Sequence, residues 1–318
     1  MTFAFRMSIG ISQIISADAM MASAHRCFDF CNIEQETVLE ENTSFPLNWP
    51  AHGEIVFKNV YMKYKSSQTY VLQNFNLAIK SGEKFGIVGR TGAGKSSILN
   101  ALFRMYNIEK GSIIIDEQDI SQLNLINYRN KISVIPQTPF TFSGTIKENI
   151  DPFNDYSESQ IWDVLEAVEL KPYVKSLTHD ILTQLSSKDN VFSIGQKQLL
   201  CLARAILRNS KILILDEATS NIDLETEALI QNKIHIFFAK STIVTIAHRI
   251  VTIADYDKVM VLHQGKILEI GEPFELLTTE KNLNEISRNG VFANLVKSLG
   301  EKSSQEILNI TKRKHFSK

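Results

Sequence analysis

The spacing of apolar residues divides this 318-residue chain into parts of different character. Over residues 1–30, apolar side chains such as Phe3, Met7 and Ile11 recur at roughly helical spacing, which predicts a helix. Residues 31–52 are polar and acidic and contain Pro46 and Pro50, which predicts a linker. After Thr278 the chain becomes polar, so residues 278–318 are predicted to be a solvated extension or tail.

Between these parts, short apolar runs bounded by polar residues indicate strands. One longer segment, Tyr156–Leu177, has helical spacing instead. Runs that are apolar throughout, alternating with helices, are typical of a parallel sheet covered on both faces, so we predict an α/β fold. The predicted strands are Glu54–Phe57, Tyr70–Leu72, Phe75–Ile79, Ile113–Ile115, Ile132–Ile135, Ile212–Leu215, Thr242–Ile246 and Lys258–Leu262.

A glycine-rich turn follows the apolar run Phe85–Val88 and leads into a predicted helix. Its sequence, Gly89-Arg-Thr-Gly-Ala-Gly-Lys95-Ser96, fits the phosphate-binding loop pattern G-x-x-x-x-G-K-[ST]. Backbone N–H groups at such a helix N-terminus converge on an anion, and the helix dipole adds positive potential. We expect Lys95 to contact the β- and γ-phosphates of a nucleotide and Ser96 to bind Mg²⁺.

Two carboxylates follow the apolar run Ile212–Leu215, namely Asp216 and Glu217. At the end of a buried strand beside the loop, Asp216 is placed to hold Mg²⁺, and Glu217 to orient or deprotonate the attacking water. Taken alone, the pair is also compatible with a strand that ends in a solvated turn.

A second helix start lies at Ser193-Ile-Gly195-Gln196, ahead of a long apolar helical run. The S-x-x-Q spacing predicts a capping box. The same N-terminus has the character of an anion site, and on a separate lobe it would serve a nucleotide held by a partner.

Composition narrows the class of protein. The net charge is −1, so no overall field favours nucleic acid or an anionic membrane. Three cysteines, an odd and sparse set, favour a reducing compartment. No apolar run is long enough for a complete transmembrane helix.

These motifs occur in the order of an ATP-binding cassette (ABC) ATPase, since Ile246-Ala-His248-Arg249 follows them. Over residues 53–277 the chain resembles the second nucleotide-binding domain of subfamily C, the multidrug-resistance-associated transporters. The longest runs that carry the resemblance are Gly86–Ser97, Glu148–Phe153, Leu202–Arg208 and Thr245–Arg249. It implies a P-loop NTPase core of RecA-like type, an antiparallel β subdomain, and a helical signature subdomain at about 138–207. Residues 1–30 resemble the cytoplasmic end of the last transmembrane-domain helix, truncated.

The resemblance assigns roles to individual residues. It implies that Tyr64 stacks on adenine, with Tyr61 and Tyr70 as neighbouring alternatives, and that Gln137 contacts Mg²⁺ and the attacking water. It makes His248 the switch residue at the γ-phosphate and places Asp223 in a loop at the dimer interface. Ser193, Gly195 and Gln196 are implied to contact ATP held by the opposing domain. The nucleotide-binding set is Tyr64, Gly89, Thr91, Gly92, Ala93, Gly94, Lys95, Ser96 and Ser97; the catalytic set is Glu217, His248 and Gln137; the Mg²⁺ ligands are Ser96, Gln137 and Asp216.

The signature departs from the family at Phe192, where Leu is usual, and at Ile194, where most members have Gly; both side chains are expected to pack. Together, the motifs and the resemblance predict an exporter domain that binds and hydrolyses Mg·ATP at the cytoplasmic face of a membrane. Its expected partners are the first nucleotide-binding domain and the transmembrane domains of the same transporter, with no nucleic acid.

Three alternatives are open at this point. A regulatory ABC domain would sense nucleotide without turnover, but the presence of Glu217 and His248 disfavours it. The second alternative is a soluble ABC ATPase of DNA repair or translation. The DNA-repair members carry a long coiled coil between loop and signature, where this chain has about a hundred residues. A GTPase lacks support because Asn232-Lys-Ile-His235 fails the guanine motif at its last position.

Overall fold

The computed structural model describes residues 2–33, 36, 48–65, 67–186, 191–216, 222–247, 249–279, 283 and 285–316. It divides into two compact units, Met1–Leu39 and Glu40–Lys318. The first unit contains one helix, α1 (Thr2–Cys31), which confirms the predicted N-terminal helix. Its apolar side chains are exposed, as at Phe3, Ile14 and Phe28. Among the described residues, no helix combines the length and apolar character that crossing a membrane requires.

A six-stranded sheet forms the centre of the second unit, with the strand order β12-β11-β3-β10-β9-β6. Strands β6, β9, β10, β3 and β11 run parallel to one another, and β12 pairs antiparallel with β11 at the edge. Because helices cover both faces of the parallel strands, every side chain of β10 is buried, and so is β9 up to its last residue. The bounds are β3 Lys84–Val88, β6 Ile132–Ile135, β9 Ile212–Asp216, β10 Thr242–Ile246, β11 Lys258–His263 and β12 Lys266–Gly271.

An antiparallel sheet of order β2-β1-β4-β5 packs in the same core as the parallel strands and α2 (Lys95–Leu102). It confirms the expected antiparallel subdomain. The separate strand predicted at Tyr70–Leu72 is wrong: Leu72 begins β2, and the two residues before it lie outside the strand. The bounds are β1 Ile55–Met62, β2 Leu72–Ile79, β4 Lys110–Ile115 and β5 Gln118–Asp119.

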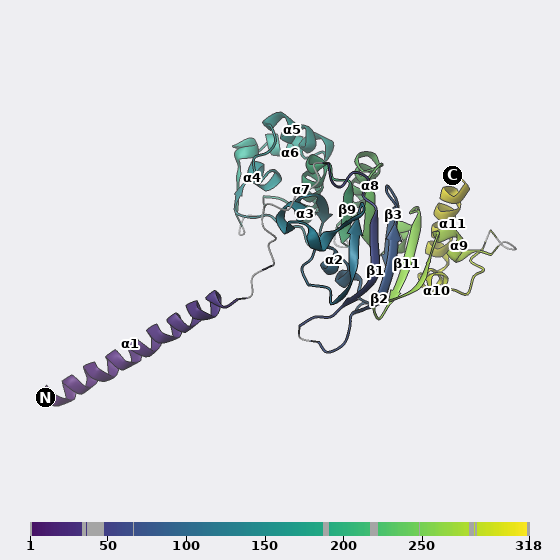
Figure 1. Cartoon of the computed structure of the whole chain (residues 1–318). Coiled ribbons are helices and arrows are strands. Elements are labelled where there is room, and N and C mark those ends of the chain that lie inside the picture. The colour runs from purple at the N-terminus through teal and green to yellow at the C-terminus, as the bar shows by residue number, and fades with distance from the viewer. Residues whose placement is uncertain are drawn as a thin grey trace. The chain divides into compact units, whose positions relative to one another are not determined.

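Helices and two short strands make up the part between β6 and β9, and Figure 1 shows α4, α5 and α6 gathered at one end of the second unit. The single helix predicted over Tyr156–Leu177 is wrong, because the chain leaves the helical conformation at Glu169 (φ 63°) and restarts with Pro172 in its first turn. The predicted apolar face is nevertheless buried at Ile161 and Leu165. The bounds are α3 Leu125–Asn130, β7 Gly144–Thr145, α4 Ile146–Ile150, α5 Glu158–Ala167, α6 Lys171–Lys175, β8 Gln184–Leu185 and α7 Ile194–Arg208.

The C-terminal part is folded, so the predicted solvated tail is wrong for residues 291–316. Phe292, Val296, Ile307 and Leu308 are buried in one cluster with strand β11. The sequence pattern does not reveal this burial, because the apolar residues are spread among charged ones. They lie on one face of each of two helices, α10 and α11. Figure 1 shows these helices beside β11, on the opposite end from α4–α6. The bounds are α8 Leu224–Phe237, α9 Pro273–Leu277, α10 Val291–Lys297 and α11 Glu301–Phe316.

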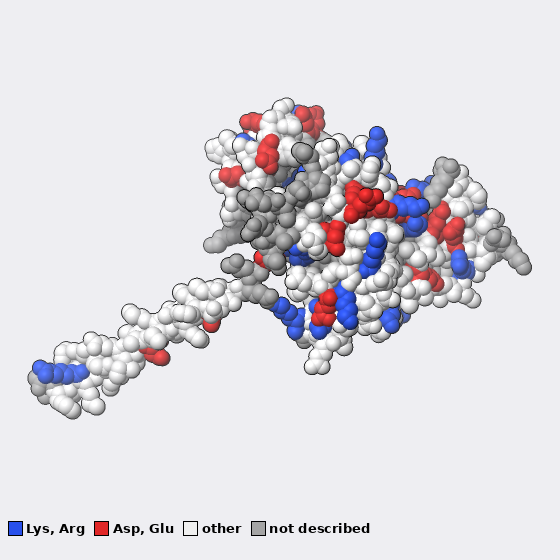
Figure 2. Space-filling model, in the orientation of Figure 1, with Lys and Arg blue, Asp and Glu red and all other residues white. Residues whose placement is uncertain are grey.

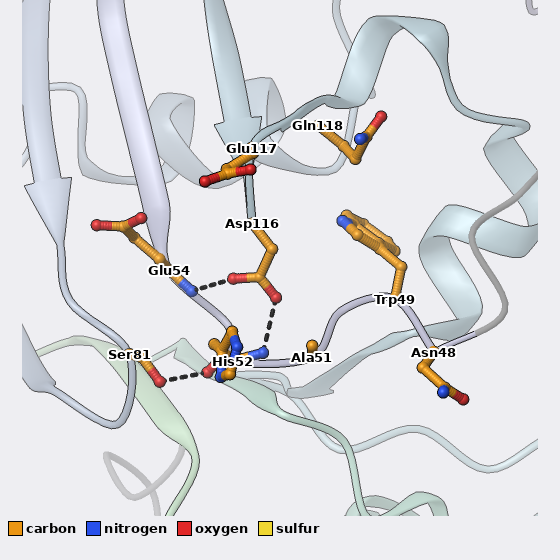
Figure 3. A pocket seen from close by; sticks show the side chains of 9 residues that line it. All are labelled: Asn48, Trp49, Ala51, His52, Glu54, Ser81, Asp116, Glu117 and Gln118. Carbon is orange, nitrogen blue, oxygen red and sulfur yellow. Dashed lines mark hydrogen bonds between the residues drawn. The ribbon is translucent and has the colours of Figure 1, made fainter.

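Residues 49–54, just before β1, are hydrogen-bonded to the antiparallel sheet (Figure 3). The Asp116 carboxylate accepts hydrogen bonds from the backbone N–H groups of His52, Gly53 and Glu54 at 2.8–3.0 Å. The buried Trp49 indole donates to the Ile115 carbonyl at 3.0 Å. A hollow of about 630 Å³ lies here, and none of its lining residues belongs to the predicted nucleotide site.

Candidate nucleotide-binding site

The glycine-rich turn connects β3 to α2, as predicted. Gly92 (φ 80°) and Gly94 (φ 103°) adopt the left-handed conformation that side chains disfavour. A Cβ at Gly89 would lie 2.4 Å from the Leu262 carbonyl oxygen of β11, so only glycine permits this approach. The loop therefore has the tight backbone that presents N–H groups to a phosphate.

Lys95 begins α2 and folds back over the loop. Its Nζ donates to the carbonyl oxygens of Gly89 at 2.8 Å and Arg90 at 3.4 Å, and the residue is only 8% exposed. Both partners are neutral carbonyl oxygens, and no carboxylate is among these two contacts. A cation in such a place interacts strongly with an anion that replaces the water. The next residue, Ser96, is exposed at the helix start.

The parallel register brings the predicted catalytic positions to one edge of the sheet. Ile246 of β10 lies between Ile87 of β3 and Asp216 of β9. On the other side of β9, Ile135 of β6 pairs with Leu215. The phosphate loop, Asp216 and the segment carrying Gln137 thus follow the carboxyl ends of neighbouring strands. In open α/β sheets, ligands bind at this edge.

Several predicted residues fall outside the described residues: Glu217, His248, and the Ser220–Asn221 part of the interface loop. Among the described ones, Asp216 is half-buried and Gln137 is exposed. Strand β10 lies between β3 and β9 in the sheet. The roles of Glu217 and His248 therefore remain predictions from sequence.

Tyr64 lies just beyond β1 and reaches α2. Its hydroxyl is 2.8 Å from the Ser97 hydroxyl and accepts a hydrogen bond from Asn100 Nδ2 at 3.1 Å. Its ring meets the Tyr106 ring edge to face, with centroids 4.7 Å apart. The alternative, Tyr61, packs against Tyr70 instead. Of these tyrosines, Tyr64 is thus the one joined to the helix that carries the phosphate loop.

The signature segment begins α7, and the predicted capping box is confirmed. Ser193 Oγ accepts from the Gln196 N–H at 3.2 Å, and Gln196 Oε1 accepts from the Ser193 N–H at 2.9 Å. Phe192 is buried against Tyr173, as expected. The expectation that Ile194 packs is wrong, because 57% of it is exposed at the first helical position.

Gly195 brings the start of α7 close to the start of α8. A Cβ there would come within 3.3 Å of the Thr226 side chain. Asp223 caps α8, accepting from the Thr226 N–H and hydroxyl at 2.9 Å each, and these bonds lower the Asp223 pKa. Since the folded-state pKa is lowered, the cap is complete above the ordinary aspartate range and is lost as pH falls through the lowered value. Signature and predicted interface loop thus form neighbouring surfaces.

Sequence reasoning missed Gln198, which joins the signature helix to the segment before Gln137. It is fully buried on α7, and its Nε2 donates to the Pro136 carbonyl at 3.0 Å. The available signal was a glutamine directly before the apolar run Leu199–Leu202, where a buried amide requires a partner. It also missed Asn100, whose contact with Tyr64 no local pattern reveals.

Comparison with known proteins decides the family. Residues 72–220 match the family model described as "ABC transporter". This chain contains an ABC transporter domain. The ABC domain is similar to "ATP-binding cassette sub-family C member 2" of Rattus norvegicus, with 46% identity over 82% of this chain and 17% of the relative. It is 43% identical to "Metal resistance protein YCF1" of Saccharomyces cerevisiae, over 86% of this chain and 18% of the relative.

A third relative matches over more of this chain. "Probable multidrug resistance-associated protein lethal(2)03659" of Drosophila melanogaster is 43% identical over 95% of this chain and 22% of the relative. The solved "Structure of a bacterial Atm1-family ABC exporter with ATP bound" matches with a TM-score of 0.75 and 28% identity, over 88% of this chain and 47% of that one. The ABC chain therefore spans about a fifth of its curated relatives' length. The matched exporter structure has ATP bound, and the ABC domains of exporters are ATPases.

The start of α7 allows a test that separates capping from contact with a partner. Ser193→Asp keeps an excellent N-cap residue, whereas Ser193→Ala removes the cap and is expected to cost about 1 kcal/mol of unfolding free energy. If Ser193 also touches a partner's phosphates, the aspartate repels them. We expect Ser193→Asp to retain thermal stability but to lose hydrolysis of the ATP that the opposing domain holds. Wild-type hydrolysis in Ser193→Asp would remove the phosphate role.

Proposed function

We propose that this chain is the second nucleotide-binding domain of an ABC exporter and that it hydrolyses Mg·ATP to power transport of a solute across a membrane. One observation supports the proposal best: the phosphate loop, Asp216 and the Gln137 segment follow the carboxyl ends of neighbouring parallel strands. The proposed domain covers residues 53–277, with the helical subdomain at about 138–207.

The proposed Mg²⁺ ligands have suitable chemistry. Ser96, Gln137 and Asp216 offer a hydroxyl, an amide oxygen and a carboxylate, and Mg²⁺ prefers hard oxygen donors alongside substrate phosphates. When bound, Mg²⁺ would neutralise charge on the β- and γ-phosphates.

The chain's own residues divide the remaining work. Lys95 and the loop N–H groups bind and orient the phosphates, where a dry, positive site favours the developing charge. Glu217 accepts or polarises the proton of the attacking water, and Gln137 holds that water in line. His248 contacts the γ-phosphate. Tyr64 supports the base.

A partner cassette completes each site in this proposal. Ser193, Gly195 and Gln196 contact ATP held by the opposing domain, and Asp223 lies in the interface between the two. The partner is the first nucleotide-binding domain of the same transporter. Helix α1 is the cytoplasmic end of the membrane domain, a role supported by its exposed apolar side chains, which require a cover. Figure 2 shows few charged side chains on this helix.

The proposed location is the cytoplasmic face of a membrane, reached through the transmembrane domains. Nucleic acid is not a proposed partner. On the face seen in Figure 2, acidic and basic side chains of the second unit are interspersed rather than gathered into one basic patch.

The partner requirement predicts how turnover depends on concentration. Alone, the chain is expected to hydrolyse ATP slowly at low concentration, because its own loop lacks the opposing signature. Turnover per chain should rise with chain concentration or on addition of the first cassette. The measurement is phosphate release across a wide range of concentrations of this chain, with the first cassette alone as the control. Constant turnover per chain, unaffected by the added cassette, would contradict the composite site.

The adenine role of Tyr64 predicts a loss of nucleotide affinity. Tyr64→Ala is expected to weaken ATP binding by about 1–3 kcal/mol, the range for stacking between a base and an aromatic ring. Inosine and guanosine triphosphates should lose similar amounts, since stacking discriminates little among purines. Fluorescent-nucleotide titration measures this beside Tyr61→Ala. If the loss appears with Tyr61→Ala and not with Tyr64→Ala, the assignment belongs to Tyr61.

A further inference from the structure

Three residues around α2 form a continuous hydrogen-bonded chain, and one of them, Asn100, lies outside the proposed nucleotide-binding set. Asn100 Nδ2 lies 3.1 Å from the Tyr64 hydroxyl, which lies 2.8 Å from the Ser97 hydroxyl. Ser97 is 5% exposed and Asn100 is half-buried, so water competes weakly for these bonds. The chain connects the proposed base platform to the second turn of the helix that begins at Lys95.

The chemistry of the three groups favours one direction for the protons. The Asn100 amide nitrogen is a donor only, so the Tyr64 oxygen accepts from it. A phenol is a better donor than an aliphatic hydroxyl, and its remaining proton therefore points to Ser97 Oγ. Ser97 then accepts from Tyr64, which leaves its own proton for another acceptor. A phosphate oxygen held by the adjacent loop is an anionic acceptor of the strong kind.

We propose that Asn100 is a positioning residue that holds Tyr64 and Ser97 together. The ring that stacks on the base and the hydroxyl that donates a hydrogen bond to a phosphate are then oriented as one unit. The proposal rests on the proposed ATP-binding function and adds a residue to it. The Tyr106 ring, edge to face with Tyr64 at 4.7 Å, backs the platform on one side. Tyr64 thereby acts on the phosphates through its hydroxyl as well as on adenine through its ring.

Tyr64→Phe tests this directly, because it keeps the ring and removes only the hydroxyl. If the ring merely stacks, the affinity for ATP is unchanged. If the hydroxyl directs Ser97, the affinity falls about 3- to 10-fold, the range of one hydrogen bond. Mg-tripolyphosphate, which has no base, should weaken by a similar factor. A purely structural or stacking role would leave the tripolyphosphate affinity unchanged.

Asn100→Leu removes the donor at the start of the chain and should weaken both ligands in the same direction. Because the three groups act in series, the variant with both substitutions should bind no more weakly than Tyr64→Phe alone. Calorimetric titration of each variant provides the dissociation constants. Fold changes that multiply in the double variant would overturn the relay. If Asn100→Leu does not fold, Tyr64→Phe with tripolyphosphate decides the question.

Tyr70→Phe is the matched control. Its hydroxyl donates to Glu109 at 2.8 Å and lies outside the chain from Asn100 to Ser97. Wild-type affinity is expected for this variant. Failure of the relay and failure of the function are distinguishable: a wild-type protein that does not bind ATP contradicts the proposed function, whereas ATP binding that is equal in wild type and Tyr64→Phe contradicts only the relay.

Discussion

Glu217→Gln is expected to lower steady-state phosphate release by about 10²–10⁴-fold while ATP still binds. The substitution keeps the size and polarity of the side chain but removes the negative charge that accepts the water's proton. The loss corresponds to roughly 3–5 kcal/mol of activation free energy at 1.36 kcal/mol per decade. Lys95, Ser96 and Asp216 are untouched, so the nucleotide affinity should be equal or tighter, since one negative charge near the γ-phosphate is gone.

The neighbouring carboxylate should behave differently. Asp216→Asn is expected to weaken nucleotide binding itself and to reduce its dependence on Mg²⁺, because Asp216 is the proposed ligand at the end of β9. Measuring affinity and phosphate release on both variants separates the two roles. Glu275→Gln, an exposed position on α9, is the matched control for the chemical change. Near wild-type phosphate release from Glu217→Gln would contradict the catalytic role of Glu217 and would favour a domain that only senses nucleotide.

Lys95→Ala is expected to abolish tight ATP binding. The ammonium is held over the loop by two carbonyl oxygens at a site only 8% exposed, and it is the proposed partner of two phosphate groups. A charge-assisted hydrogen bond contributes about 1.5–3 kcal/mol, so the dissociation constant should rise by about 10²-fold or more.

Fluorescent-nucleotide titration compares Lys95→Ala with the wild type. Lys58→Ala removes an exposed lysine of β1 and should bind ATP normally, which controls for the change in net charge. The thermal midpoint of each variant shows whether the fold is retained, since Lys95 also bonds the loop. Equal affinities of Lys95→Ala and wild type would remove the phosphate loop from the account.

The central strands could be predicted because their burial is dictated locally. The run Thr242–Ile246 becomes β10 with the predicted bounds, and Ile212–Leu215 becomes β9 with Asp216 added. Strands buried on both faces have a continuous apolar sequence that polar residues interrupt only at the ends. The phosphate loop was equally predictable, because its glycines, lysine and serine occupy fixed positions relative to the strand and the helix.

Other features depend on partners far away in the sequence. The capping box at Ser193 is visible locally, but the contact from Gln198 to Pro136 spans 62 positions, and that from Asn100 to Tyr64 spans 36. The sequence predicts a tail where the C-terminal helices lie, because Phe292 and Ile307 are isolated hydrophobic residues in otherwise polar segments. Their burial depends on packing in one cluster with β11. Tertiary packing therefore determines these contacts and helices, and local sequence propensity alone does not.

The central claim, that this chain cleaves ATP with Glu217, is tested most directly by the identity of the nucleotide that remains bound after a single turnover. Wild type and Glu217→Gln are each loaded with Mg·ATP in the presence of the first cassette, freed of excess nucleotide, and quenched after increasing times. The account predicts that bound ATP becomes ADP in the wild type and remains ATP in Glu217→Gln. Conversion to ADP at the same rate in both proteins would contradict it.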